Sequence, residues 1–391
     1  MISKRMKEIG VSPTLALAAK AQQLKREGED VISLAIGEPD WETISSAKNK
    51  ALWAINNNNK TTYTPAKGIL ELRQAISKDF ERYYGQFYDA NKEICVSSGA
   101  KISLFAVMQC LLDKEDEIIM PAPMWLSYMA MAGLADGQVK TVTQKDGKIS
   151  PKNLEALITD KTKMILINSP NNPSGVVYTV EEFEALGRVL EKYPRVIIMS
   201  DEIYNKLYFK EDNNVAPSFV ASCPNLRDRV VTVNGASKSF AMTGWRVGWT
   251  LGPENIISKV TAYLSQSTGC PCQVSQWAAV GALEDGASEV ESIRVMLKKR
   301  ISNVCKKLTE LGFDYIKPEG AFYVCLNLED KLGKYENDID FCDALLEDKK
   351  VVTVPGTYFG MENSVRLSLA TSEDLIYEAL NRVKDFINEN K

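Results

Sequence analysis

The chain of 391 residues contains no histidine. This absence excludes every catalytic or metal site that needs an imidazole, including Ser–His–Asp and Cys–His catalysis, the HExxH zinc motif and the facial iron triad. A proton transfer near neutral pH must therefore use a lysine, a carboxyl group, a tyrosine or a cysteine with a shifted pKa, or else a cofactor.

Cysteine is also sparse. The eight cysteines are scattered and lack the paired CxxC spacing of zinc sites, so we predict neither a disulfide scaffold nor a metal site. The nearest two, Cys270 and Cys272 in "GCPCQ", are more typical of two buried loop cysteines than of a redox pair.

Long hydrophobic runs and an excess of positive charge are missing as well. No segment approaches the roughly 18 apolar residues that a membrane span needs, and no apolar stretch follows the basic residues of the N-terminus. The net charge of −4 offers no basic surface for nucleic acid. We therefore expect a cytoplasmic protein that binds neither nucleic acid nor membrane.

The central part of the chain has the pattern of an α/β protein. Between about 90 and 255, short apolar runs rich in β-branched residues alternate with helical segments, which predicts a mainly parallel sheet. We predict helices over 101–112 and 180–193. The predicted strands are 93–97, 117–121, 163–168, 195–200, 230–234 and 246–251.

The two ends of the chain indicate a second, smaller unit. At the N-terminus a helix is predicted over 12–28, with Ser12 as its cap and Gly28 at its end. After about 285 we predict a long charged helix over 288–312, three apolar runs at 320–328, 351–356 and 364–369, and a final helix over 372–389. We predict a large domain over 45–285 and a smaller α+β domain made of 1–44 and 286–391.

Polar residues follow five of the predicted strands. Ligands of open α/β sheets bind at this edge, beyond the carboxyl ends of the strands. Each residue also has an ordinary interpretation: a tight turn, a core tryptophan, a β-turn, a helix N-cap for Asp201 and a surface lysine. The segments are "SSGAK" (97–101), "PAPMW" with Trp125, "SPNNPSG" with Asn172, "SDEIY" with Asp201 and Tyr204, and "GASK" with Lys238.

The combination of these residues favours a cofactor site. The amides of Gly99, Ala100 and Lys101 form a possible phosphate nest, and the neighbouring segments add an aromatic plate, an acid, two polar donors and a lysine. Neither a GxGxxG fingerprint nor a P-loop is present. A ligand with a phosphate, a flat ring, a basic ring nitrogen and an aldehyde would use every element, and pyridoxal 5′-phosphate fits this description.

Nearly the whole chain resembles the class I aminotransferases of the pyridoxal-phosphate fold-type I superfamily, most closely the bacterial aspartate aminotransferase branch. The resemblance implies a large α/β domain with a mainly parallel seven-stranded sheet flanked by helices, and a smaller α+β domain. The segments that carry it are "GEPDW" (37–41), "YTPAKGILELR" (63–73), "SSGAK", "PAPMW", "NSPNNPSG", "SDEIY", "SKSFAMTGWRVG", "PEGAFYV" (318–324) and "VRLSLATS" (365–372).

The resemblance assigns roles around the cofactor ring. Lys238 would bind the cofactor aldehyde and later move the proton from Cα to C4′, and Asp201 would pair with the ring nitrogen. Tyr204 and Asn172 would donate to the phenolic oxygen, while Trp125 would stack on the ring.

Further roles concern the phosphate and the substrate. Tyr63 would reach the phosphate of the neighbouring subunit, which implies a homodimer with shared active sites. Arg366 would clamp the substrate α-carboxylate near the Gly37 backbone, with Trp125 and Asn172 also in contact with substrate. The phosphate ligands implied within one chain are Ser237, Arg246 from the next strand, and the amides of Gly99, Ala100 and Lys101.

The implied activity is transamination of an L-amino acid, with aspartate as the first expectation, and 2-oxoglutarate as acceptor, in a ping-pong reaction through pyridoxamine phosphate. Aromatic, alanine, kynurenine or prephenate specificity remains open, as do a β C–S lyase and a regulatory module without turnover. Thr14 is a candidate for the distal carboxylate by position, although an ordinary first-turn helix residue is the preferred interpretation.

The chain departs from relatives at three places. Gly235 stands where many relatives have a serine that helps to bind the phosphate, and no histidine is present to orient Asp201. Cys270 and Cys272 lie in a loop that helps to select the substrate in parts of the family. The residue that contacts the substrate side chain is therefore not identified by the resemblance.

Overall fold

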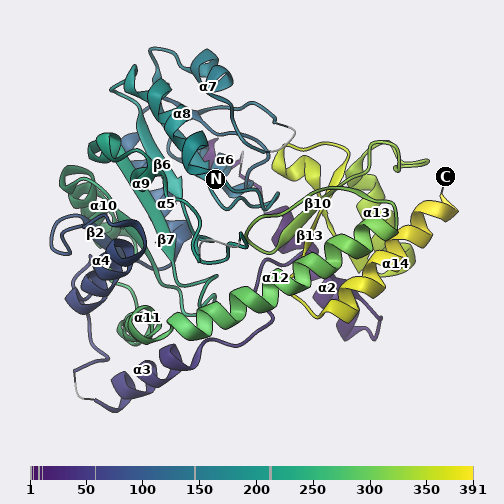
Figure 1. Cartoon of the computed structure of the whole chain (residues 1–391), viewed down its shortest axis with the longest axis horizontal. Coiled ribbons are helices and arrows are strands. Elements are labelled where there is room, and N and C mark those ends of the chain that lie inside the picture. The colour runs from purple at the N-terminus through teal and green to yellow at the C-terminus, as the bar shows by residue number, and fades with distance from the viewer. Residues whose placement is uncertain are drawn as a thin grey trace.

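The computed structural model describes residues 2–390 except 3, 8, 11, 58, 145–146 and 211–213. Its larger sheet occupies the teal and green part of Figure 1, and a smaller sheet lies in the yellow-green part. The long helix α12 (Ala287–Glu310) runs from the first part to the second.

The larger sheet has seven strands, and each of the six predicted strand ranges corresponds to one of them. Strand β8 runs antiparallel to both neighbours, whereas the other pairs are parallel. In spatial order the strands are β2 (Ile94–Ser97), β8 (Gly248–Leu251), β7 (Val230–Gly235), β6 (Ile197–Asp201), β5 (Thr162–Asn168), β3 (Glu117–Ile119) and β4 (Gln138–Lys140).

Side chains that alternate along each strand pack on both faces of this sheet. Along β5, Met164 and Leu166 join one hydrophobic cluster, whereas Ile165 and Ile167 join another on the opposite face. Helices on both faces of the sheet contribute to these clusters, as expected for a parallel sheet buried on two sides. These helices are α3 (Ser45–Asn56), α4 (Leu70–Tyr84), α5 (Ala100–Leu111), α6 (Ser127–Leu134), α7 (Pro151–Leu157), α8 (Val180–Glu191), α9 (Phe219–Ser222), α10 (Glu254–Ser267) and α11 (Gln273–Asp285).

The smaller sheet is antiparallel and is built from late segments of the chain. Its order is β12 (Val354–Pro355), β13 (Ser364–Ser368), β10 (Tyr323–Asn327) and β9 (Asp314–Ile316). The N-terminal strand β1 (Ile32–Ser33) pairs in parallel with β11 (Val351–Val352). Further elements are α1 (Lys4–Lys7), α2 (Pro13–Arg26), α13 (Asp338–Lys349), α14 (Glu373–Glu389) and the 3-10 helices η1 (Pro224–Arg229) and η2 (Gly356–Phe359).

The predicted α/β class and the seven-stranded sheet are confirmed. All six predicted strands match the observed ones to within two residues at each end. The strand predicted over 246–251 begins at Gly248, so Arg246 lies just before it, with a φ of 55°. The seventh strand, β4, is a short, largely exposed edge strand without an apolar run, which explains why no residue range was predicted for it.

The predicted helix at the N-terminus is present, and Ser12 is its N-cap residue, as predicted. The Ser12 hydroxyl does not accept a hydrogen bond from a helix amide and instead pairs with the Thr14 hydroxyl over 2.9 Å. Gly28 follows the helix with a φ of 92°, a left-handed conformation that favours glycine. The division into domains at residues 44 and 285 stays a prediction. Among the described helices, none has the length and apolar character required to cross a membrane.

Candidate active site

A cavity of about 390 Å³ lies at the carboxyl edge of the larger sheet, where the segments after β5, β6 and β7 meet segments of the smaller sheet and the N-terminal region. Most of the predicted site residues line it. These are Gly37, Ala100, Lys101, Trp125, Asn172, Asp201, Tyr204, Ser237, Lys238, Arg246 and Arg366.

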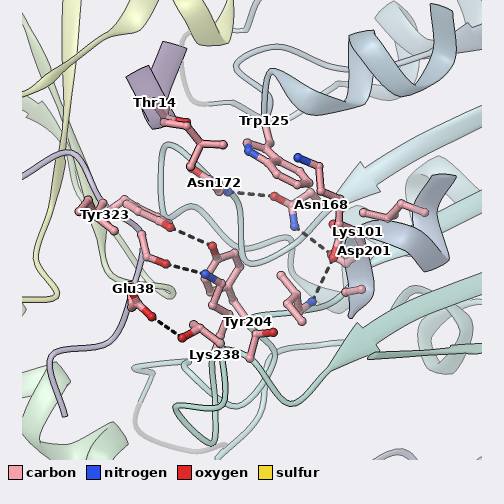
Figure 2. Close-up of a pocket in the computed structure, with 18 of the residues that line it drawn as sticks. Thr14, Glu38, Lys101, Trp125, Asn168, Asn172, Asp201, Tyr204, Lys238 and Tyr323 are labelled. Atoms are coloured by element: carbon pink, nitrogen blue, oxygen red, sulfur yellow. Dashed lines mark hydrogen bonds between the residues drawn. The ribbon is translucent and has the colours of Figure 1, made fainter. Parts of the chain in front are cut away.

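Lys238 follows β7 and projects into the middle of this cavity, as Figure 2 shows. Its Nζ donates a hydrogen bond to the Gly37 carbonyl oxygen over 2.5 Å. Burial lowers the pKa of Lys238 to about 8, helped by the positive charges of Arg366 and Arg246 and opposed by two nearby carboxylates. A lysine in this setting is more readily deprotonated than a surface lysine, so it can serve as a nucleophile and as a base.

Asp201 ends β6 and is only 3% exposed. One carboxylate oxygen, Oδ2, accepts a hydrogen bond of 2.6 Å from the Tyr128 hydroxyl, and Oδ1 accepts one of 3.2 Å from the Ile203 amide. Burial raises the pKa of Asp201 to about 6, while these hydrogen bonds and Lys238 act in the opposite direction. No helix begins at Asp201, so the alternative interpretation as a helix N-cap is wrong.

The start of α5 forms the end of the cavity that is suited to an anion. Gly99 has a φ of 98°, and a Cβ added there would lie 2.5 Å from Nη2 of Arg246. A Cβ on Gly248 would lie 2.2 Å from the Ala100 amide nitrogen. Only glycines therefore allow the guanidinium and the first amides of α5 to approach one another, which creates a cationic N-terminal helix site.

Trp125 is half-buried with its ring at the cavity, so the interpretation as a core tryptophan is wrong. The Tyr128 ring packs against it edge to face, with centroids 5.4 Å apart. The ammonium group of Lys101 lies 5.0 Å from the Trp125 ring centroid. Burial and the charge of Arg246 lower the pKa of Lys101. The Lys101 side chain is thus a cation of the cavity, beyond the backbone role that the sequence indicated.

The opposite wall is formed by Arg366 on β13 and its neighbours. Arg366 is 3% exposed, and its Nη1 donates to Oδ1 of Asn172 over 3.1 Å while Nη2 donates to the Ala35 carbonyl. Its buried Nε has no hydrogen-bond partner among the described residues. The guanidinium also lies 4.6 Å from the ring centroid of Tyr323. A planar fork with an unpaired donor is well suited to a carboxylate.

Tyr323 was not identified from the sequence, although it lies in the quoted segment "PEGAFYV". Its hydroxyl is 3.0 Å from that of Tyr204, and a Cβ on Gly37 would lie 2.0 Å from the same oxygen. Tyr323 therefore joins the two walls and explains the glycine at position 37. In Figure 2, Tyr323 and Glu38 lie on one side, Trp125 and Asp201 on the other, and Lys238 and Tyr204 between them.

Two further residues of the cavity were missed. Asn168 ends β5, accepts a hydrogen bond from the Asn172 amide and donates one to the Asp201 carbonyl. Tyr128 is the second residue of α6 and comes three positions after Trp125, and this short distance from a predicted site residue is the signal that the sequence offers. Thr14 also lines the cavity.

Tyr63 does not line the cavity and is 97% exposed. The adjacent Thr64 amide donates a hydrogen bond to the Cys270 sulfur over 3.4 Å. Cys270 is half-buried but Cys272 is exposed, so the expectation of two buried cysteines is wrong.

Comparisons with known proteins agree with this site. The sequence model described as "Aminotransferase class I and II" matches residues 29–383. The chain is 40% identical to the aspartate aminotransferase of Bacillus subtilis over 100% of this chain and 99% of that protein. It is 39% identical to the aspartate/prephenate aminotransferase of Nitrosomonas europaea over 99% and 100%.

The fold agrees equally well. The structure of the aspartate aminotransferase from Thermus thermophilus with maleate superposes with a TM-score of 0.93, at 36% identity and 99% coverage of both chains. The predicted resemblance to the bacterial aspartate aminotransferases is confirmed. The chain therefore belongs to the class I and II aminotransferase family and is an aminotransferase.

Proposed function

We propose that this aminotransferase uses pyridoxal 5′-phosphate to transfer the amino group of L-aspartate to 2-oxoglutarate, in a ping-pong reaction through pyridoxamine phosphate. The observation that carries the proposal is the distribution of charge in one cavity. Arg246 lies beside Gly99 at the start of α5, and Arg366 lies beside Asn172. Lys238, which the charges of both arginines affect, and the buried Asp201 line the same cavity.

The cavity suits the cofactor on three grounds. The glycines at 99 and 248 leave space for a cationic cradle of Arg246 and the first amides of α5, which suits a phosphate. Asp201 is a buried acid that needs a cationic partner, and a protonated ring nitrogen provides one. Trp125 presents a ring to the cavity. When bound, pyridoxal phosphate supplies an aldehyde that takes up the amino group and a ring that accepts electrons from the Cα–H bond.

The chain's own residues supply the proton chemistry. Lys238 has a pKa near 8, so its Nζ can lose a proton near neutral pH and then take the proton from the substrate Cα. Asp201, as an anion, would keep the ring nitrogen protonated. The side-chain oxygen of Asn172 accepts a hydrogen bond from Arg366, so its side-chain nitrogen remains able to donate to the phenolic oxygen of the cofactor. The Tyr204 hydroxyl lines the same cavity and would be a second donor.

The wall around Arg366 would bind the substrate. Nε of Arg366 is buried without a partner among the described residues, so an incoming α-carboxylate would satisfy it. Arg366 is fixed by Asn172, by the Ala35 carbonyl and by the Tyr323 ring, which limits the entropy lost on binding. We propose that this wall holds the α-carboxylate with the Gly37 backbone beside it.

Lys101 would distinguish a dicarboxylic substrate. With Arg246 at the phosphate end and Arg366 at the α-carboxylate, the ammonium of Lys101 over Trp125 is a third cation at the same cavity. A distal carboxylate of aspartate would pair with it, and the Thr14 hydroxyl also lines the cavity. The Thermus thermophilus relative holds maleate, a four-carbon dicarboxylate, which supports this assignment.

We also propose a homodimer in which Tyr63 of each subunit completes the partner's site. Its 97% exposed side chain is consistent with burial by a second subunit. Light scattering coupled to size-exclusion chromatography tests the dimer directly. The cytoplasmic location stays a prediction.

The experiment that tests the proposed function is a half-reaction screen. Purified holoenzyme is mixed with single amino acids while the visible absorption band of the cofactor aldehyde is followed. We expect aspartate and glutamate to abolish the band and 2-oxoglutarate to restore it. A stronger response to aromatic amino acids or alanine, or to prephenate as acceptor, would contradict the aspartate assignment. Release of pyruvate from cystathionine without an acceptor would instead indicate a β C–S lyase.

A further inference from the structure

Asp201 lies in a pocket that contains no histidine because the chain has none. The carboxylate is nevertheless fixed at both oxygens. The Ile203 amide holds Oδ1 over 3.2 Å, and the phenol of Tyr128 donates to Oδ2 over 2.6 Å. The contact from Tyr128 is short, comes from a different element and is made by a side chain. A substitution at this position can therefore remove it, whereas the backbone contact from Ile203 remains.

Tyr128 is held so that its hydroxyl has a single position. It is the second residue of α6, is 1% exposed and belongs to the main hydrophobic cluster. Its ring packs edge to face on Trp125, with an interplanar angle of 85°. The ring packing and the helix thus fix the phenol oxygen against Asp201, which ends β6 and lines the cavity.

We propose that Tyr128 is the positioning residue of the reaction: its hydroxyl keeps the Asp201 carboxylate ionised and aimed at the cofactor ring nitrogen, while its ring supports Trp125. This inference rests on the proposed function in its mention of the cofactor. The link between Tyr128 and Asp201 itself rests on the contacts above.

A phenol differs from an imidazole in what it can do here. Burial, together with the charge of Asp201, raises the pKa of Tyr128 well above its ordinary value, so the group stays protonated and always donates. The other titratable groups around Asp201 are Lys238, Tyr204 and Glu202. A histidine at this position would change its own protonation state near neutral pH, but Tyr128 does not. We therefore expect the ionisation of Asp201 to be unaffected by a titration of the residue that orients it.

The first test uses the cofactor-free protein, so that its outcome does not depend on the proposed function. Protonated carboxyl groups are titrated by difference infrared spectroscopy in wild type, Tyr128→Phe and Asp201→Asn. The band absent from Asp201→Asn belongs to Asp201, and Glu202→Gln identifies the signal of the neighbouring buried acid Glu202, whose pKa is about 7. In Tyr128→Phe we expect the Asp201 midpoint to rise by about one to two pH units, the effect of losing a charge-assisted hydrogen bond.

The second test uses the holoenzyme. In Tyr128→Phe the cofactor dissociation constant should rise about tenfold. The loss of activity should be largest at the acid end of the pH profile and should diminish above pH 8, where Asp201 is ionised without help. Tyr128→His should restore a donor, recover part of the affinity and add a neutral-range step to the profile.

A matched control is Tyr88→Phe, which removes another buried phenol that has no hydrogen-bond partner among the described residues. It should leave the Asp201 midpoint and the pH profile unchanged. An Asp201 midpoint that does not move in Tyr128→Phe, or that moves equally in Tyr88→Phe, would overturn the inference. If Tyr128→Phe does not fold, Tyr128→His decides it, because an unchanged pH profile there would equally overturn it. If the wild-type protein binds no cofactor but the Asp201 midpoint rises as expected in Tyr128→Phe, the proposed function alone would be refuted.

Discussion

The two walls of the cavity are built in different ways. On the sheet side, Asn168, Asp201 and Lys238 follow three neighbouring parallel strands, so each enters the site from the end of its own strand. On the other side, Gly37 and Arg366 belong to segments of the N-terminal region and the smaller sheet that meet only through tertiary packing. The first wall depends on one sheet, and the second depends on the contact between two parts of the chain.

The walls also differ in electrostatics. On the sheet side, burial moves the pKa values of Asp201 and Lys238 toward the neutral range, to about 6 and about 8. On the other side, Arg366 is surrounded by a carbonyl, an amide and two aromatic rings, and its Nε has no hydrogen-bond partner in the described part of the chain. This difference indicates that the sheet side carries out proton chemistry, whereas the other side recognises substrate.

The largest effect is expected on the sheet side. In Lys238→Ala the cavity loses its base, and kcat for aspartate transamination should fall by about 10⁴-fold. A coupled assay that detects oxaloacetate measures this loss. Lys192→Ala, which removes an exposed lysine paired with Glu155, is the matched control and should retain full activity. Full activity in Lys238→Ala would contradict the assignment of the base.

A change on the other wall should spare the cofactor. In Arg366→Lys the planar fork is lost, and kcat/KM for aspartate should fall by about 10²- to 10³-fold while the cofactor band stays unchanged. Arg300→Lys is the control, because Arg300 forms a two-point contact with Asp40 outside the cavity. Loss of the cofactor band with an unchanged KM for aspartate would contradict the assignment of Arg366 to substrate binding.

The buried acid should reduce the stability of the cofactor-free protein. Its pKa is raised, so below about pH 4 Asp201 is neutral in both the folded and unfolded states, whereas above about pH 6 it must ionise in the folded state against burial. Relative to Asp201→Asn, the wild-type free energy of unfolding should therefore fall by about 3 kcal/mol between pH 4 and pH 6, and then stay constant.

Urea unfolding at a series of pH values measures this difference. Asp160→Asn changes an exposed carboxylate and should show no comparable dependence on pH. A difference that grows in the opposite direction would mean that Asp201 is stabilised, not destabilised, as an anion.

The smallest effect concerns substrate choice. In Lys101→Ala the backbone of α5 is retained but the cation over Trp125 is removed, so the preference for aspartate over alanine should fall by about 10- to 100-fold. Ratios of kcat/KM for the two amino acids measure this preference, with the exposed Lys114→Ala as control. An unchanged ratio would assign recognition of the distal carboxylate to another residue.

The sequence was informative on the sheet side because strand ends are local features. Asp201 and Lys238 each follow an apolar run, so their meeting at one edge could be predicted without knowing the packing. The same reasoning placed Arg246 on a strand, although it lies in the turn before β8. Its left-handed backbone and the close approach of its guanidinium to Gly99 are features that an apolar run does not indicate.

The other wall was less predictable. Arg366 was identified only by resemblance, and Tyr323 was missed because its role depends on the oxygen-to-Gly37 and oxygen-to-Tyr204 contacts between distant segments. Tyr128 was missed for a different reason: an apolar helix face predicts a core residue, and its hydroxyl contact with Asp201 becomes visible only in three dimensions. Long-range packing, which periodicity does not encode, accounts for each of these omissions.

The most direct test of the two-wall account compares two arginines in the same cavity. Dissociation constants for pyridoxal phosphate, and for maleate in the cofactor-saturated enzyme, are measured in Arg246→Gln and Arg366→Gln. The account predicts that Arg246→Gln weakens the cofactor by about 100-fold with little change for maleate, and that Arg366→Gln does the reverse. Equal weakening of both ligands by both variants, or an exchange of the two effects, would contradict it.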